Sequence, residues 1–246
     1  MREAPALGRL VPFAPRDSVH VWHARVSVLE RWLAELRDVL SDQERARVEQ
    51  FRFSRDRHRA IVARGLLRVI LGRCLDAEPS RLCFTYGPHG KPALSEDRGV
   101  CFNVAHSGDL VLWAVAREHD IGVDVERMRA GLEWPAMAPR FFAPGEVAAL
   151  HALPGERRQE GFFACWTRKE SYLKATGLGL ALRLEAFSVS VDPRAPAALL
   201  SVEGVPDASA RWSLADLTVD PGYRACLAAP EPRVRPVRHE IAGGAL

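Results

Sequence analysis

Two long helix-forming segments, each followed by strand-forming sequence, constrain the fold of this chain more than any other feature. FRFS at 51–54 and FFAP at 141–144 each introduce helical sequence. After the first motif the apolar residues keep helical spacing, and the stretch 155–177 is typical of a second long helix that Gly177 closes. This loose duplication predicts two similar subdomains, joined near residues 115–135.

Shorter segments complete the predicted elements. SDQE at 41–44 is a capping-box signature for a helix, and Pro144 suits the first turn of another. Strand-forming composition and turn residues predict strands within 19–26, 81–86, 100–126, 187–192, 211–219 and 223–230. We therefore divide the chain into an N-terminal subdomain, 1–120, a C-terminal subdomain, 121–232, and a tail, 233–246.

Composition and charge exclude several classes of protein. The chain has 246 residues, of which 48% are hydrophobic and 26% charged, and its net charge of +3 is too small for an indiscriminate nucleic-acid binder. No run approaches ~18 apolar residues, and the N-terminus carries charges and prolines where a signal peptide needs an apolar run. Five scattered cysteines without a CxxC pair indicate reduced thiols. We expect a cytoplasmic protein that binds neither membrane nor nucleic acid.

The candidate chemistry lies in a strand and a helix that both carry carboxylates. In IGVDVE (121–126), Asp124 and Glu126 share one face of the predicted strand, and Val123 and Val125 face the core. Glu170 and Lys174 lie one turn apart on the second long helix. If the helix lies beside the strand, three carboxylates meet, and such a cluster repels itself unless a cation sits among them. Oxygen ligands alone favour Mg²⁺, with Mn²⁺ as an alternative.

Each of these features also has an ordinary structural explanation. A DxE pair is common on a solvated strand face, and Glu170 with Lys174 is typical of an ion pair on a helix surface. His106, beside the turn at Ser107, can simply bond local backbone. Only the combination, in this order and at these separations, favours a reactive site.

Four motifs, in chain order, resemble those of the 4′-phosphopantetheinyl transferases. They are FNVAHSG (102–108), IGVDVE (121–126), FFAPGE (141–146) and WTRKESYLK (166–174). The chain is most similar to the longer, monomeric type that activates polyketide and nonribosomal peptide synthases. With the duplication, the resemblance implies an α+β fold of two similar subdomains related by a pseudo-twofold axis, each a small antiparallel sheet packed on a long helix.

The resemblance implies a metal-assisted transfer from coenzyme A. A serine of an apo acyl or peptidyl carrier protein attacks the β-phosphorus, 3′,5′-ADP leaves, and phosphopantetheine stays on the serine. Asp124, Glu126 and Glu170 match the metal-binding carboxylates of the family. Glu170, directly or through a water, is also the candidate base, and Lys174 is suited to a phosphate oxygen as charge develops.

The 3′-phosphate of coenzyme A needs its own cationic contacts. Arg64, Lys91 and His106 match positions where the family binds the nucleotide phosphates. Ala105 departs from the serine that often precedes the histidine, which removes one hydroxyl contact. Two roles stay open for Glu146: support of the metal through water, or a carboxylate that only favours the helix dipole.

Two other functions use the same residues. A magnesium-dependent hydrolase would use water as the nucleophile and release ADP without a carrier, and a non-catalytic relative would bind coenzyme A or a carrier without reacting. The silent relative is disfavoured because the chain keeps all four candidate residues, Asp124, Glu126, Glu170 and Lys174. The hydrolase is disfavoured because the sequence has no recognisable P-loop. We expect a monomer whose arginine-rich surface suits a small acidic carrier protein.

Overall fold

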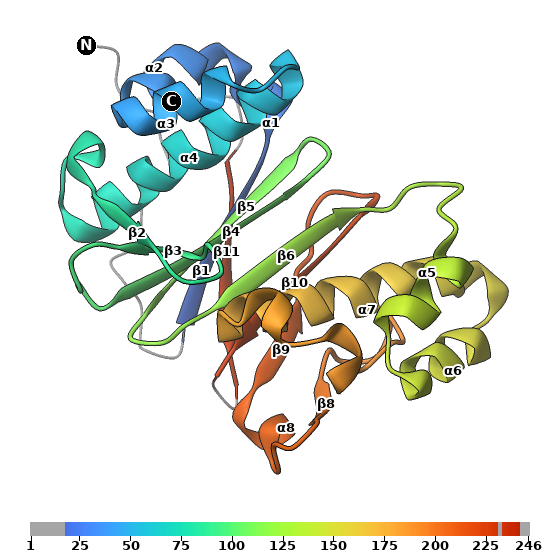
Figure 1. The fold of residues 1–246 in the computed structure, drawn as a ribbon. Helices are drawn as coiled ribbons and strands as arrows, with labels where there is room; N and C mark the ends of the chain where they lie inside the picture. Colours follow the sequence, from blue (N-terminus) through green and yellow to red (C-terminus); the bar gives the residue numbers. More distant parts are fainter. Residues whose placement is uncertain (1–17, 231–232, 242–246) are drawn as a thin grey trace.

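The protein, described here by a computed structural model over residues 18–230 and 233–241, folds into four layers (Figure 1). Helix α4 (Ser54–Leu75) covers the outer face of one sheet, and α7 (Gly155–Thr176) covers the outer face of the other. The first sheet has the order β11 (Arg235–Glu240), β1 (Ser18–Arg25), β5 (Leu110–Arg117), β4 (Val100–Ser107). The second has the order β6 (Gly122–Arg127), β10 (Tyr223–Ala229), β9 (Ser213–Asp216).

Smaller elements surround these layers. The helices among them are α1 (Val26–Leu29), α2 (Leu33–Asp38), α3 (Asp42–Glu49), α5 (Trp134–Phe141), α6 (Pro144–Ala152) and α8 (Ala208–Arg211). Two hairpins add β2 (Phe84–Tyr86) with β3 (Pro92–Leu94), and β7 (Phe187–Val189) with β8 (Leu199–Val202). None of the helices described is long and apolar enough to cross a membrane. The α+β architecture of two similar halves is as predicted.

Side-chain alternation in the strands separates three cores. Along β5, Trp113 packs under α4, whereas its neighbours Leu112 and Ala114 lie in the core between the two sheets. Val123 and Val125 of β6 enter the same central core from the second sheet, as the sequence predicts. Because β5 is apolar on both faces, every residue from 110 to 116 is buried. This central strand therefore joins the N-terminal core to the middle layer.

The prediction of a tail at 233–246 is wrong for the residues from 235 to 240. They form β11, which pairs in parallel with β1, so the first sheet is mixed and not purely antiparallel. In Figure 1 this red strand runs into the blue and green half of the molecule. Its proline and alternating charges resemble a linker, but an edge strand tolerates both. Ile241 then packs into the N-terminal core. Residues 1–17 and the end of the predicted tail, 242–246, lie outside the described residues.

Several predicted strands are shorter than expected. The strand within 81–86 begins only at Phe84, because the carbonyls of Pro79, Ser80 and Leu82 accept hydrogen bonds from the buried guanidinium of Arg68. The predicted helices from Ser41, Ser54, Pro144 and Gly155 are confirmed. Helices α2 and α5 and strand β8 carry no clear pattern and were not predicted.

A glycine fixes the distance between α7 and β6. A Cβ atom at Gly122 would lie 2.0 Å from the Ser171 carbonyl oxygen and 2.4 Å from the Ala175 amide nitrogen. Only glycine lets the helix backbone approach the strand this closely. Gly122 shares a strand face with Asp124, so the contact sets α7 directly over the carboxylates of β6.

We expect Gly122→Ala to lower the free energy of unfolding by about 3 kcal/mol, because the added methyl group meets backbone atoms that cannot turn aside. Gly145→Ala is the matched control, since a Cβ there meets no atom within 4 Å. Urea denaturation of both variants measures the difference. Equal stability of the two would mean that α7 does not depend on the close approach.

Candidate active site

Strand β6 and helix α7 bring the predicted carboxylates to one face. Lys174 Nζ lies 2.6 Å from Asp124 Oδ1 and 3.4 Å from the Val123 carbonyl oxygen. Asp124 and Glu126 face α7, and Glu170 lies one helical turn before Lys174. We call Asp124, Glu126 and Glu170 the carboxylate cluster. The sequence prediction that helix and strand lie side by side is confirmed.

Asp124 is the most perturbed member of the cluster. Its side chain is 7% exposed, and its Oδ2 atom is buried without a hydrogen-bond partner in the described part of the chain. Burial raises the pKa of Asp124 to about 7; Lys174 opposes this rise, and the charges of Glu126 and Glu170 add to it. A buried oxygen without a partner is costly unless a cation or water satisfies it.

The two other carboxylates respond to the same surroundings. Burial raises the pKa of Glu170, with Lys174 acting against the rise and Glu126 adding to it. Glu126 Oε2 accepts a hydrogen bond of 2.6 Å from Ser107 Oγ, which itself accepts one from the Arg127 amide. Ser107 was not predicted as a site residue, because its place on β4, in the other half of the chain, carries no sequence signal of this contact.

The donor set fits a divalent cation in its chemistry. It consists of oxygens only, and Asp124 Oδ2 is a buried acceptor without a partner in the described residues. As the side chains stand, no three histidine, cysteine or carboxylate groups in residues 18–230 and 233–241 converge on one ion position. The ammonium of Lys174 lies beside Asp124 and contributes positive charge to the cluster.

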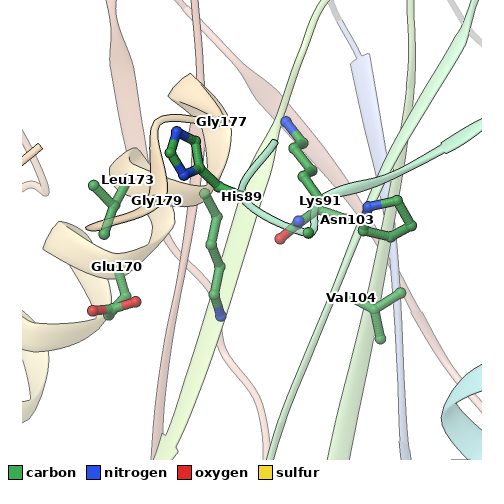
Figure 2. A pocket seen from close by; sticks show the side chains of 11 residues that line it. His89, Lys91, Asn103, Val104, Glu170, Leu173, Gly177 and Gly179 are labelled. Carbon is green, nitrogen blue, oxygen red and sulfur yellow. The ribbon is translucent and has the colours of Figure 1, made fainter. Parts of the chain in front are cut away.

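A cavity of about 490 Å³ opens beside the cluster (Figure 2). Glu170, Leu173 and Lys174 of α7 line one side, and Asn103 and Val104 of β4 line the other. The turn at 89–92 and the glycines that follow α7 complete its wall. Figure 2 shows the side chains of Lys91 and Asn103 opposite Glu170 across this space. The cavity lies between the two halves of the chain, with Glu170 and Lys174 in its wall.

Lys91 lies at the cavity but has partners already. Its Nζ atom lies 2.8 Å from Asp120 Oδ1, 3.2 Å from the Ala175 carbonyl oxygen and 3.3 Å from that of Ile121. These contacts tie the turn of the N-terminal half to the end of α7. Lys91 therefore links the two sides of the cavity. Its contact with a phosphate stays a prediction.

His106 stands at the end of β4, between the two halves. Partial shielding from water lowers the pKa of its imidazole, and the Arg59 guanidinium and the Lys174 ammonium lower it further. Arg59 from the N-terminal half and Lys174 from the C-terminal half thus both act electrostatically on His106. Arg59 was not singled out in the sequence, where it is one of many arginines. Ala105, by contrast, is buried in the central core and does not line the cavity.

Arg64 is not brought to this cavity. It pairs with Glu44, donates to the Tyr86 hydroxyl at 3.2 Å and lies over the ring of Phe84 at 3.8 Å from its centroid. It lines a second cavity of about 270 Å³ together with Arg68, which pairs with the same Glu44. The capping box predicted Glu44 as a helix cap, but not that its carboxylate also holds two arginines.

Glu146 has a structural role away from the cluster. Its Oε2 lies 2.8 Å from Lys169 Nζ, and the two side chains are 2% and 1% exposed. The carboxylate also accepts hydrogen bonds of 2.8 Å from the amides of Ala143 and Val189. Lys169 in turn donates to the Leu184 carbonyl. This buried pair joins α6 to α7, and the alternative of a metal-supporting Glu146 finds no contact with the cluster.

We expect Glu146→Gln to destabilise the protein by about 3 kcal/mol, because it leaves the Lys169 charge buried without its partner. Glu156→Gln, at the exposed start of α7, removes one carboxylate without this penalty and serves as the control. Urea denaturation monitored by circular dichroism measures both. A loss of metal binding with unchanged stability would contradict the structural role.

A pH titration tests the raised pKa of Asp124. Between pH 4 and pH 7, the folded metal-free protein keeps a proton on Asp124 that the unfolded chain, with the ordinary value of 3.8, has lost. This group therefore makes the free energy of unfolding fall as pH rises through that window. Asp124→Asn removes the contribution, so in EDTA the variant should gain stability relative to wild type from pH 4 to pH 7. A constant difference across that range would contradict the shift.

Comparison with known proteins finds the same kind of enzyme in both halves of the chain. The family model described as "4'-phosphopantetheinyl transferase superfamily" matches residues 120–228, and that of "4'-phosphopantetheinyl transferase, N-terminal" matches residues 22–118. The 4'-phosphopantetheinyl transferase HetI of Nostoc sp. is 39% identical over 216 residues, which cover 87% of this chain and 86% of HetI. The 4'-phosphopantetheinyl transferase Sfp of Bacillus subtilis is 30% identical over 194 residues, covering 78% of this chain and 83% of Sfp. The relative psf-1 of Bacillus pumilus is 30% identical over 200 residues, covering 81% and 83%.

Proposed function

Because the chain belongs to the 4′-phosphopantetheinyl transferase superfamily, we propose that the carboxylate cluster and Lys174 form its catalytic centre. The enzyme transfers phosphopantetheine to carrier proteins. In the proposed reaction an acceptor serine of an apo acyl or peptidyl carrier protein takes the arm of coenzyme A, and 3′,5′-ADP is released. The observation that carries this assignment is the contact of Lys174 with Asp124, beside Glu170 in the wall of a cavity.

The bond changes assign a role to Glu170. The serine Oγ forms a bond with the β-phosphorus of coenzyme A, and the bond from that phosphorus to the oxygen of the leaving nucleotide breaks. The serine proton passes to Glu170, directly or through a water. A raised pKa makes this carboxylate a stronger base than an exposed glutamate, and its position in the cavity wall gives it access to the substrate.

Lys174 stabilises the charge that develops on the phosphate. Its side chain is 31% exposed, so the ammonium can reach a ligand in the cavity as well as Asp124. Placed within hydrogen-bond distance of a non-bridging oxygen, it favours the transition state over the ground state. Lys174 is thus both a coenzyme A contact and a catalytic residue in this proposal.

Asp124, Glu126 and Glu170 are the residues that would hold a Mg²⁺ ion, or Mn²⁺ in its place. When bound, the cation supplies positive charge to the pyrophosphate of coenzyme A. Ser107 would keep Glu126 in its position through the hydrogen bond described above. The unsatisfied Oδ2 of Asp124 supports this assignment.

The nucleotide end of coenzyme A is proposed to lie along β4, beside the cavity between the halves. His106 and Arg59 are suited to the 3′-phosphate, since Arg59 and Lys174 both act electrostatically on the imidazole of His106. Lys91 can contribute only by leaving Asp120 and two carbonyl oxygens. Arg64, held by Glu44 at another cavity, is left out of the proposed site.

We further propose that the enzyme works as a monomer in the cytoplasm and serves polyketide or peptide synthases. The halves 1–120 and 121–232 both contribute to the centre, since Ser107 comes from one and Glu126 from the other. One chain therefore contains every residue of the proposed site. All five cysteines are free thiols in the structure, which suits a reducing compartment.

We expect Glu170→Gln to lower kcat by about 10²- to 10⁴-fold, because the amide cannot take the serine proton. Intact-protein mass spectrometry of an apo carrier protein, incubated with enzyme, coenzyme A and Mg²⁺, measures the transfer. The wild type should add one phosphopantetheine arm, and EDTA should stop the reaction. Glu156→Gln serves as the control for loss of a carboxylate on the same helix.

The same assay separates the transferase from the alternative functions. Consumption of coenzyme A without any change in carrier mass would favour the hydrolase. Neither consumption nor transfer, across fatty-acid, polyketide and peptide carriers, would contradict the proposal. Full activity of Glu170→Gln would remove this residue from the mechanism.

A further inference from the structure

We propose that the start of α4 carries a docking surface for the acidic carrier protein that presents the acceptor serine. This surface, called here the phenylalanine–arginine patch, consists of Phe51, Arg52, Phe53 and Arg55. The inference rests on the proposed function, because it names the place where the second substrate of that site binds.

Two large aromatic side chains are exposed together in this patch. Phe53 is 54% exposed and Phe51 38%, although Val48 before them and Ile61 after them are buried in the N-terminal core. Exposed aromatic rings cost solvation free energy, and neighbouring ones are typical of binding surfaces. Aromatic residues and arginine are also the types most enriched at the energetic centre of protein interfaces.

Two arginines lie over the exposed Phe53 ring and give the patch a positive charge. The guanidinium carbons of Arg52 and Arg55 lie 5.4 Å and 5.6 Å from the centroid of the Phe53 ring. The Arg55 side chain is 81% exposed, and its nearest acidic contact, with Asp56, is long at 3.9 Å. A partner that carries carboxylates next to an apolar side chain would satisfy both components.

Acidic residues nearby are engaged with other arginines. Asp56 Oδ1 lies 2.8 Å from the Arg59 guanidinium, and Glu49 contacts Arg37 at 3.1 Å and Arg57 at 3.7 Å. The exposed charge at the start of α4 is therefore positive. Charge complementarity favours an acidic protein surface over a second copy of this chain, whose same patch would repel it.

Helix α4 is linked to the proposed site through β4. The helix packs against this strand, whose Ser107 donates a hydrogen bond to Glu126 of the carboxylate cluster. Arg59 of α4 and Lys174 of α7 both act electrostatically on His106, the residue before Ser107. A carrier protein whose serine reaches Glu170 would lie against β4 beside α4, where the patch can hold it.

Steady-state kinetics with the carrier protein varied at saturating coenzyme A tests the proposal. We expect Phe53→Ala, and the double variant Arg52→Glu with Arg55→Glu, each to raise the KM for the carrier about tenfold. The KM for coenzyme A should stay unchanged. The double variant should also reduce the dependence of the carrier KM on salt concentration.

Two controls match these changes at other places. Arg81→Glu reverses a charge on an exposed residue near the opposite end of α4, and Leu200→Ala truncates a side chain that is 56% exposed on β8. Both should leave the carrier KM as in wild type. An equal effect of Arg81→Glu would mean a general loss of positive charge and would overturn the patch.

Direct binding separates this inference from the proposed reaction. Calorimetric titration of the enzyme with a carrier protein whose acceptor serine is changed to alanine reports docking without transfer. Weaker binding by the patch variants supports the patch, even if wild-type transfer fails. Unchanged binding and unchanged carrier KM overturn it, as does a rise in the KM for coenzyme A alone. A change in oligomeric state on centrifugation of the patch variants would assign the surface to a second copy and would equally overturn it.

Discussion

The site depends on the close contact of α7 with β6 at Gly122. Without a side chain at this position, the strand approaches the backbone of Ser171 and Ala175, and the helix lies flat along it. Glu170 and Lys174 then stand on the part of the helix that faces Asp124. A bulkier residue would push the helix away and separate the groups whose charges must act together. The glycine of IGVDVE is therefore as necessary to the chemistry as its two carboxylates.

The N-terminal half completes the site through β4, which contacts β6 of the second sheet. The Oδ1 atom of Asn103 accepts a hydrogen bond of 2.9 Å from the Val123 amide, and Ser107 donates to Glu126. Both residues lie on β4 and reach β6, so they hold the two sheets in register next to the reactive groups. Lys91 adds a third tie, between its own turn and the end of α7. The cavity thus keeps its shape through contacts that no single half can make.

Local pattern was sufficient for the long helices and for the faces of the reactive strand. The alternation in IGVDVE predicts that the side chains of Asp124 and Val123 point to opposite faces of the strand, and the structure agrees. Tertiary pairing was not accessible in this way. Nothing near Arg64 indicates that Glu44, twenty residues earlier, would hold it at another cavity. Likewise, β11 has an edge-strand composition that becomes a strand only because β1 offers it a free edge.

Burial explains why neighbouring residues of one motif differ so much in role. Lys169 and Lys174 are two of only three lysines in the chain, and both lie on α7 in WTRKESYLK. Five residues apart, they point to different sides of the helix. Lys169 is enclosed between the rings of Phe142 and Phe187 and neutralised by Glu146, so its charge cannot reach a substrate. Lys174 meets Asp124 at a cavity wall, where its ammonium stays partly exposed. The same residue type stabilises the fold at one position and is available to a phosphate at the other, because only the second borders open space.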